Sequence, residues 1–337
     1  MKHSTLLIPL LFVALTACNK SEMPPQVPEE GSGTIVLSVQ GDFTPETKVT
    51  SDSALTDEEK TINTVQIIVF NSAGDIELRM KNSDFTVSGT TATASATLTT
   101  GAKTVWCLVN GPDVQSMTNS QLQARKIELD GYNGEGAFVQ SASAACTITK
   151  NTSTPLTLKV RRYVARVTLS DVKNELESQL TITRVYTYIA NYVKESYLYS
   201  GNGIGTYGNI GGKKNSQSIN SANIATDPDL TAVGFDDVIQ YDEALSDYGL
   251  DPFRMYTYPT PSGGTRQWLV TAAEIGGHWY YYNYQMPTLA ANTAYTVEMV
   301  LKRLGADEPC VENGTGTLSV TVTPEAWTAG ASTSKTF

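Results

Sequence analysis

The stretch LTLKVRRYVARVTL, which runs from Leu156 to Leu169, decides how the rest of the chain is interpreted. Valine, leucine and threonine dominate both of its ends, and these residues are common in β-strands. The stretch is too long for one ordinary strand, so it predicts a pair of successive strands. We take this pair as the seam between two domains.

Short apolar stretches of the same kind recur on both sides of the seam. They lie at 34–39, 64–70, 104–109, 138–140 and 146–150 before it, and at 180–192, 268–271, 279–284, 295–302 and 317–323 after it. Turn signals such as Asn71-Ser-Ala-Gly74 separate neighbouring stretches. The best helical segment of the first half is 119–126. Many short strands with few helices indicate an all-β sandwich protein.

Composition and charge exclude several classes of function. The length of 337 residues fits two ordinary domains or one large β domain, and 34 acidic against 24 basic side chains give a net charge of -10. A protein that follows a phosphate backbone needs a basic surface, so we expect no nucleic acid among the partners. The histidines are His3 and His278 alone. We therefore expect no enzymatic site, no multi-histidine metal site and no cofactor.

The N-terminus is predicted to be a lipoprotein signal peptide, residues 1–17. After a short polar start, the run from Leu6 to Leu15 is almost wholly apolar, which suits a secretion signal and is too short to span a bilayer. It ends in Leu15-Thr-Ala-Cys18, which is similar to the lipobox of bacterial lipoproteins. We expect acyl chains on Cys18 to attach the precursor to the outer membrane.

The segment after Cys18 reads as a tether followed by a strand and a loop. Residues 19–33 contain three prolines and two glycines, as an extended tether would. The strand at 34–39 places Ile35, Leu37 and Val39 on one face. Residues 41–61 are polar and charged, so we expect an exposed loop there with a helical turn near its end.

These features resemble the fimbrillins of the Bacteroidales, whose FimA-like subunits build type V pili. The resemblance rests on the lipobox, the strand after the tether, the 65–70 strand with its Asn-to-Gly turn, the 105–112 strand with its Asn-Gly-Pro exit, the 162–169 seam and the C-terminal VTVTPEAW of 320–327. Together these segments touch both halves and both ends of the chain.

The resemblance implies two tandem β-sandwich domains of transthyretin-like type in a lipoprotein precursor. We expect the tether and a removable first strand at 18–48, the first sandwich at 49–158 and the second at 159–337. In that family a protease removes the first strand, and the C-terminal strand of a neighbouring subunit fills the apolar groove left behind. The implied function is a non-enzymatic fimbrial subunit that polymerises by donor-strand exchange and supports adhesion.

The resemblance also assigns roles to particular residues. The removable strand would present Ile35, Leu37 and Val39, and the donor strand would present Leu318, Val320 and Val322. An added strand satisfies the unpaired backbone groups of such a groove and buries its own side chains. Ordinary edge strands show the same alternation, so the pattern alone leaves both interpretations open.

Maturation is where this chain departs from the family. The family's protease cuts after arginine between the first and second strands, yet the first arginine here is Arg79. The loop offers Lys48 and Lys60, and we take Lys48 as the maturation site. Expected partners are copies of the chain itself, accessory fimbrial subunits, the maturation protease and an unidentified host or bacterial surface ligand. An uncut subunit would keep its lipid, so an anchor or accessory role stays open.

A glycan-binding surface lipoprotein is the alternative from a different class. The run from His278 to Tyr284, HWYYYNY, is rich in rings that stack on sugars, although a strand would divide them between two faces. Glycines at 203–208 satisfy G-x-G-x-x-G without a βαβ unit, and the acidic residues at 227–243 lack EF-hand spacing. Neither segment predicts a cofactor or a metal site.

Three cysteines remain after Cys18. Cys107 and Cys146 both fall in predicted strands of the first half, so a disulfide between them is possible in an oxidising compartment. Buried free thiols are the equally acceptable interpretation.

Overall fold

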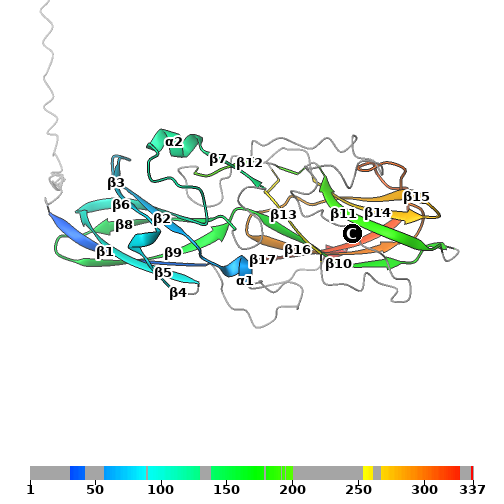
Figure 1. The fold of residues 1–337 in the computed structure, drawn as a ribbon, viewed down its shortest axis with the longest axis horizontal. Helices are drawn as coiled ribbons and strands as arrows, with labels where there is room; N and C mark the ends of the chain where they lie inside the picture. The colour runs from blue at the N-terminus through cyan, green and yellow to red at the C-terminus, as the bar shows by residue number, and fades with distance from the viewer. Residues whose placement is uncertain are drawn as a thin grey trace, which may run out of the picture.

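The computed structural model describes residues 31–41, 57–88, 90–129, 138–177, 180–190, 192–193, 195–199, 253–260, 267–326 and 335–336. These residues form strands with a few short helical turns, which confirms the all-β fold class. Figure 1 shows two groups of strands that lie end to end along the long axis of the molecule, β1 to β9 in one group and β10 to β17 in the other.

The N-terminal group is a sandwich built from one folded sheet. Its strands are β1 Ser32–Gly41, β2 Val65–Phe70, β3 Ile76–Met80, β4 Thr86–Ser88, β5 Thr91–Thr99, β6 Gly101–Val109, β8 Gln140–Ile148 and β9 Ser153–Arg162. They are hydrogen-bonded in the order β3-β2-β6-β8-β9-β1-β5-β4. β8 and β9 pair only where Gln140 and Ser141 meet Arg162 and Arg161. The sheet therefore turns at this corner into two layers.

One apolar core fills the space between those layers. Alternate residues of β2, among them Ile67 and Val69, meet alternate residues of β6, such as Val105 and Cys107, and the inward face of β1. The other face of β2 is buried too, with Phe70 in a second cluster that continues into the C-terminal group. Burial on both faces explains why β2 is apolar at every position except Gln66.

The connecting elements of the N-terminal group are short. They are α1 Asp57–Lys60, the 3-10 turn Asn82–Asp84, α2 Asn119–Ala124 and β7 Lys126–Glu128. Helix α2 lies where the sequence predicted one, and Thr118 is its N-cap, because the Thr118 side chain accepts a hydrogen bond from the backbone N–H of Gln121.

The C-terminal group pairs a larger sheet with a smaller one. Its strands are β10 Ala165–Asn174, β11 Ile182–Ala190, β12 Glu195–Tyr197, β13 Phe253–Thr257, β14 Trp268–Ile275, β15 His278–Gln285, β16 Thr293–Leu301, β17 Leu318–Ala326 and β18 Lys335–Thr336. One sheet has the order β13-β10-β16-β17-β18 and the other β11-β14-β15, while β12 pairs with β7.

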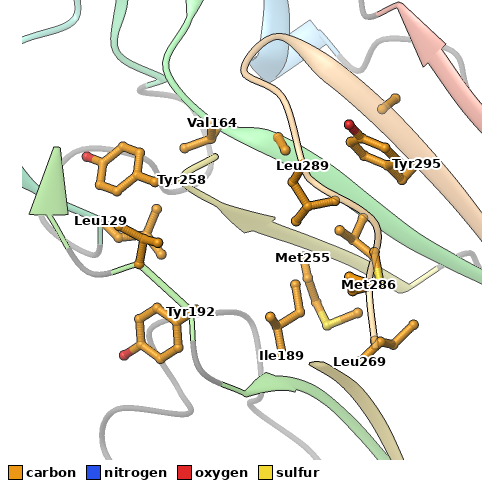
Figure 2. Packing of buried hydrophobic residues seen from close by; sticks show 14 of the residues in the cluster. Leu129, Val164, Ile189, Tyr192, Met255, Tyr258, Leu269, Met286, Leu289 and Tyr295 are labelled. Carbon is orange, nitrogen blue, oxygen red and sulfur yellow. The ribbon is translucent and has the colours of Figure 1, made fainter. Parts of the chain in front are cut away.

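A single apolar cluster joins the two groups. Figure 2 shows part of it, with Met255, Met286 and Ile189 close to Leu269, and with Tyr258 and Leu129 to their left. β9 stays in the first sheet up to Arg162, and β10 opens the second at Ala165. The predicted seam is thus a pair of strands joined by two buried residues, while the number and limits of the domains stay predictions.

Three sequence predictions lie outside the described residues: the signal peptide with Cys18, the cleavage site at Lys48, and the glycine-rich and acidic segments of 203–243. Among the described residues, no helix is long and apolar enough to cross a membrane, and no group of potential ligands is gathered to hold a metal ion.

The cysteines of the first half are both free thiols. In the β6–β8 ladder Cys107 faces Ala142, whereas Cys146 faces Lys103. The two cysteines are therefore offset by several residues along the ladder, on the order of 13 Å, while a disulfide needs Cα atoms within about 7 Å. The strands that carry the cysteines are neighbours, but the register rules out the bond.

Candidate functional site

The first strand lies inside its sheet, between β9 and β5 (Figure 1). β1 runs parallel to β9, with Thr34 to Gly41 facing Ser153 to Val160. It runs antiparallel to β5 from Ser32 to Gln40. In the order of the sheet, β5 and β4 join the other strands only through β1. Removing β1 would therefore open a slot with unpaired backbone groups on both sides.

The inward face of β1 completes the core of the sandwich. Ile35, Leu37 and Val39 are 0% exposed and pack against both layers, while Val36 on the opposite face is 41% exposed. Each buried aliphatic side chain contributes roughly 1.5–3 kcal/mol relative to its exposed state. The structure thus brings the three predicted residues of the removable strand together in one apolar groove.

A steric gate stands where β1 enters this groove. A Cβ atom added to Gly33 would lie 2.3 Å from the carbonyl oxygen of Thr149 and 2.9 Å from a methyl group of Ile148. Backbone atoms at such a distance cannot yield without moving the β8–β9 turn. We therefore infer that the strand in this seat must have a glycine at this position.

Backbone hydrogen bonds hold the entry of β1 beneath the β8–β9 turn. The N–H of Thr34 donates to the carbonyl of Thr152, and the N–H of Asn151 donates to the carbonyl of Ser32, both at 2.9 Å. Asn151 has a φ of 55°, a left-handed conformation that asparagine tolerates. These bonds depend on the main chain alone, so another strand with the same backbone path could form them.

A second group of contacts ties β5 to the opposite layer. Glu77 in β3 accepts hydrogen bonds from the N–H and the hydroxyl of Thr99 at 2.7 and 2.8 Å, and Lys103 in β6 lies 2.6 Å from its other oxygen. Burial by itself raises the pKa of Glu77, but the hydrogen bonds from Lys103 and Thr99 outweigh it and leave this pKa below its ordinary value. β5 is thus held at one end independently of β1.

The end of the predicted loop at 41–61 is anchored at the junction of the two groups. Glu59 in α1 is 0% exposed, and its carboxylate oxygens lie 2.9 and 3.0 Å from one guanidinium nitrogen of Arg166 in β10. The hydroxyl of Tyr256 in β13 donates to the same carboxylate at 2.8 Å. Burial and the neighbouring Glu59 charge raise the pKa of Tyr256, which keeps its proton available for this bond.

Arg162, the last residue of β9, completes the anchor. Its guanidinium donates to the backbone carbonyl of Glu59, with one of these bonds at 3.0 Å, and to the side chain of Asn292 at 3.2 Å. Lys60 directly follows Glu59 and is only partly exposed. Because a protease needs an exposed, pliable segment, this anchor disfavours a cut at Lys60.

The predicted donor strand lies in the other group. β17 is antiparallel to β16 over its whole length, with Leu318, Val320 and Val322 facing Leu301, Met299 and Val297. Val322 is buried, whereas Leu318 and Val320 are partly buried against the core. On its other side β17 pairs with β18 at only two positions. Within one chain the structure therefore keeps donor and groove apart.

The aromatic run considered for glycan binding is used largely in packing. Tyr281 and Tyr282 are buried in the faces of their sheet, while Trp279, Tyr280 and Tyr284 are partly buried against the same clusters. His278 lies at the exposed end of β15 and is 3.3 Å from Asp307. The described strand offers no open row of ring faces on which a sugar could stack.

The sequence analysis did not predict three features of this site. They are the steric gate at Gly33, the anchor formed by Glu59, and the contacts of Glu77 that hold β5, which we call the clamp. Glu59 stands among charged residues, which predicted an exposed loop, and its partner Arg166 lies 107 positions along the chain. The glycine pattern around Gly33 was visible in the sequence and could have drawn attention to the entry of the strand.

The fold and this site define a class: β-sandwich proteins with two groups of strands, in which the first strand lies inside its own sheet. Residues 33–224 match the family of the major fimbrial subunit protein FimA, and the chain belongs to that family. Its members are structural fimbrial subunits rather than enzymes, which confirms the resemblance seen in the sequence.

Solved structures share the fold at low sequence identity. A proposed cell adhesion protein from Parabacteroides distasonis superposes with a TM-score of 0.60 at 14% identity, covering 89% of this chain and 100% of its own. The FimA fimbrilin of Porphyromonas gingivalis gives 0.59 at 14% identity over 88% and 98%. The tip fimbrial protein Mfa3 of the same species gives 0.51 at 12% identity over 88% and 100%. No curated protein matches the sequence itself.

Proposed function

We propose that this chain is a pilin that polymerises by donor-strand exchange after proteolytic removal of β1, in a cell-surface fimbria that supports adhesion. The observation that supports it most is the position of β1 in the groove between β9 and β5, which we call its seat. β1 is an internal strand near one end of the chain, and its three apolar side chains are fully buried. A cut on its C-terminal side would free β1 from the covalent chain while the rest of the sandwich keeps its own connections.

In this proposal the precursor is a lipoprotein of the outer membrane. Residues 1–17 are the signal peptide, Cys18 carries the lipid, and cleavage after Lys48 separates residues 18–48 from the sandwiches at 49–158 and 159–337. Glu59 would stay bound to Arg166 and Arg162 at the junction of the two groups after the cut. The partners are further copies of the chain, accessory subunits, the protease and a surface ligand of unknown chemistry.

The proposed donor is β17, through Leu318, Val320 and Val322. Leaving its own sheet costs β17 its hydrogen bonds to β16, which the slot between β9 and β5 replaces on both sides. Its partly buried leucine and valine would become fully buried there. Exchange therefore increases the burial of these two side chains, while β16 loses the strand that now covers its edge.

To test the proposal, the recognition sequence of a site-specific protease is inserted after Lys48 of the precursor. We expect cut protein to form ladders that resist mild denaturation and uncut protein to stay monomeric. A matched control locks β1 in place with Val36→Cys and Ser95→Cys, which face each other on the outer side of β1 and β5. Cut, oxidised control protein should stay monomeric and polymerise on reduction, because β1 can leave only then.

Other outcomes decide against the proposal. Cut and reduced protein that stays monomeric at high concentration would refute strand exchange, and binding of polysaccharide by that monomer would favour the glycan-binding alternative. A lipid-retaining anchor or accessory subunit would be recovered from sheared surface material with its N-terminus still at Cys18. Fatty-acid labelling that persists in a Cys18→Ser chain would refute lipidation at this residue.

A further inference from the structure

Two segments of the chain share one pattern over eleven residues. Gly31–Gly41 reads GSGTIVLSVQG and Gly314–Pro324 reads GTGTLSVTVTP. Both begin with Gly-x-Gly-Thr, continue with apolar residues at alternate positions, and carry serine or threonine between the second and third apolar residues. The first segment is β1 with its entry, and the second is β17 with the turn before it.

We propose that β17 enters the β1 seat of a second copy of this chain in a single register, with Gly316 at the position of Gly33. This inference rests on the proposed function and specifies its geometry. Leu318, Val320 and Val322 then occupy the pockets of Ile35, Leu37 and Val39. Thr317 takes the place of Thr34, so that its N–H reaches the carbonyl that Thr34 now uses.

The gate at Gly33 explains why the register is fixed. A Cβ at that position meets the Thr149 carbonyl at 2.3 Å, so only a glycine of the donor can stand there. Sliding the donor by two residues in one direction would bring Leu318 to the gate, where its side chain has no room. Sliding it by one residue would turn the apolar face to solvent.

Sliding the donor by two residues in the other direction places a glycine at the gate but leaves an apolar pocket unfilled. Gly314 would then stand at the gate, and Gly316 would occupy the pocket of Ile35, which would remain empty. Val322 would move past the last pocket, because only Leu318 and Val320 would still face the core. The two glycines and the three apolar residues thus select one register together.

The partner that fits this seat is another copy of the same chain. Each subunit has a groove shaped for a Gly-x-Gly strand and a C-terminal segment with that pattern, so donor and acceptor surfaces differ and do not pair with themselves. Such a heterologous contact builds a head-to-tail filament rather than a closed dimer. The chain can therefore supply its own polymer without a different subunit as donor.

Disulfide trapping tests the register directly. In the proposed register residue 319 of the donor takes the place of Val36, which faces Ser95 of β5. Both serines are exposed, so cysteine at either position leaves the cores intact. One cut subunit carries Ser319→Cys and the other Ser95→Cys, in a background with Cys146→Ser and Cys310→Ser. Burial raises the pKa of the Cys107 thiol and keeps it unreactive.

We expect covalent dimers from this pair under mild oxidation, and at least about tenfold fewer when Thr97→Cys or Thr93→Cys replaces Ser95→Cys, because those positions lie one side-chain step away on the same face. Polymers whose disulfide forms mainly at Thr97→Cys or Thr93→Cys would refute the register and leave strand exchange standing. If the cut subunits form no polymers before cysteine is introduced, the proposed function itself fails.

A second variant isolates the glycine gate. Gly316 has a φ of 75° in its own turn, a conformation that asparagine tolerates, so Gly316→Asn should leave the monomer folded. In the groove its side chain would meet the Thr149 carbonyl, and polymerisation should slow about tenfold or more. The control is Gly74→Asn, at a φ of 85° with open space around it. Equal polymerisation of both variants would overturn the gate.

Discussion

β1 and β17 have nearly the same pattern but different surroundings. All three inward residues of β1 are 0% exposed, and full-length neighbours flank the strand on both sides. In β17 only Val322 of the corresponding three is buried, and β18 covers just two positions of its outer edge. The same alternation therefore yields a tightly held strand in one sheet and a loosely held one in the other.

This difference indicates the direction in which exchange would run. A strand gains free energy when it moves from a partly buried seat to a fully buried one, provided that its hydrogen bonds are replaced. β17 would gain burial in the groove of β1, whereas β1 has nothing to gain in the place of β17. Substitutions can test whether β1 is held more tightly than β17. They are placed in each strand and in the contacts that remain when β1 leaves.

The largest effect is expected at Glu59, which must stay in place while β1 departs. Glu59→Gln keeps the shape of the side chain but removes the negative charge that lies 2.9 Å from the buried Arg166 guanidinium. We expect a loss of about 3–5 kcal/mol in the free energy of unfolding, measured with urea. The exposed control Glu298→Gln should change it by less than about 0.5 kcal/mol. Equal effects would mean that the anchor is not stabilising.

The next effect compares one leucine in each strand. Leu37→Ala empties a fully buried pocket and should cost the uncut precursor about 2–5 kcal/mol. Leu318→Ala removes a partly buried side chain and should cost about 1–2 kcal/mol. Urea denaturation of both variants measures the contrast. If the Leu318 variant loses as much as the Leu37 variant, β17 is held as tightly as β1 and the proposed direction of exchange is wrong.

A smaller effect is expected from the paired glycines. Gly33→Ala pushes a methyl group into the Thr149 carbonyl and should destabilise the precursor by about 1–3 kcal/mol. Gly314→Ala places its methyl group 3.4 Å from the Thr317 hydroxyl, an ordinary contact, and should change stability by less than about 0.5 kcal/mol. Thermal unfolding of the two uncut variants compares their stabilities. If Gly33→Ala leaves the stability unchanged, the backbone around Thr149 can move to accommodate a methyl group.

The smallest effect concerns the clamp that holds β5. The pKa of Glu77 is lower in the folded protein than its ordinary value of 4.5, so protons bind the unfolded state more readily. Its contribution to stability is fully present above pH 4.5 and is lost as the pH falls through the lower, folded-state pKa. We expect Glu77→Gln to flatten this part of the stability profile and to leave its shape at neutral pH unchanged. If the stability of the Glu77→Gln variant falls at acidic pH just as that of the original protein does, Glu77 does not stabilise the fold through these contacts.

The sequence by itself determined the strands and their buried faces. Alternation placed Ile35, Leu37 and Val39 on one side of a strand, and apolar runs with Asn and Gly turns placed most of the others, because side-chain period and turn chemistry are local properties. The charge balance and the scarcity of histidine are also local to the sequence, and they led to the expectation of no nucleic acid and no enzymatic site. The order of these segments was enough to indicate the family.

Only the tertiary structure decided which strands became neighbours. That β1 lies between β9 and β5, that Gly33 passes beneath the Thr149 carbonyl, and that Glu59 is buried against Arg166 all depend on pairings between residues distant in the sequence. The sequence predicts that a charged residue in a polar segment is exposed, because it does not show that the fold places a buried counter-ion beside it. Local pattern fixes the face of a strand, whereas its neighbours depend on how the whole core closes.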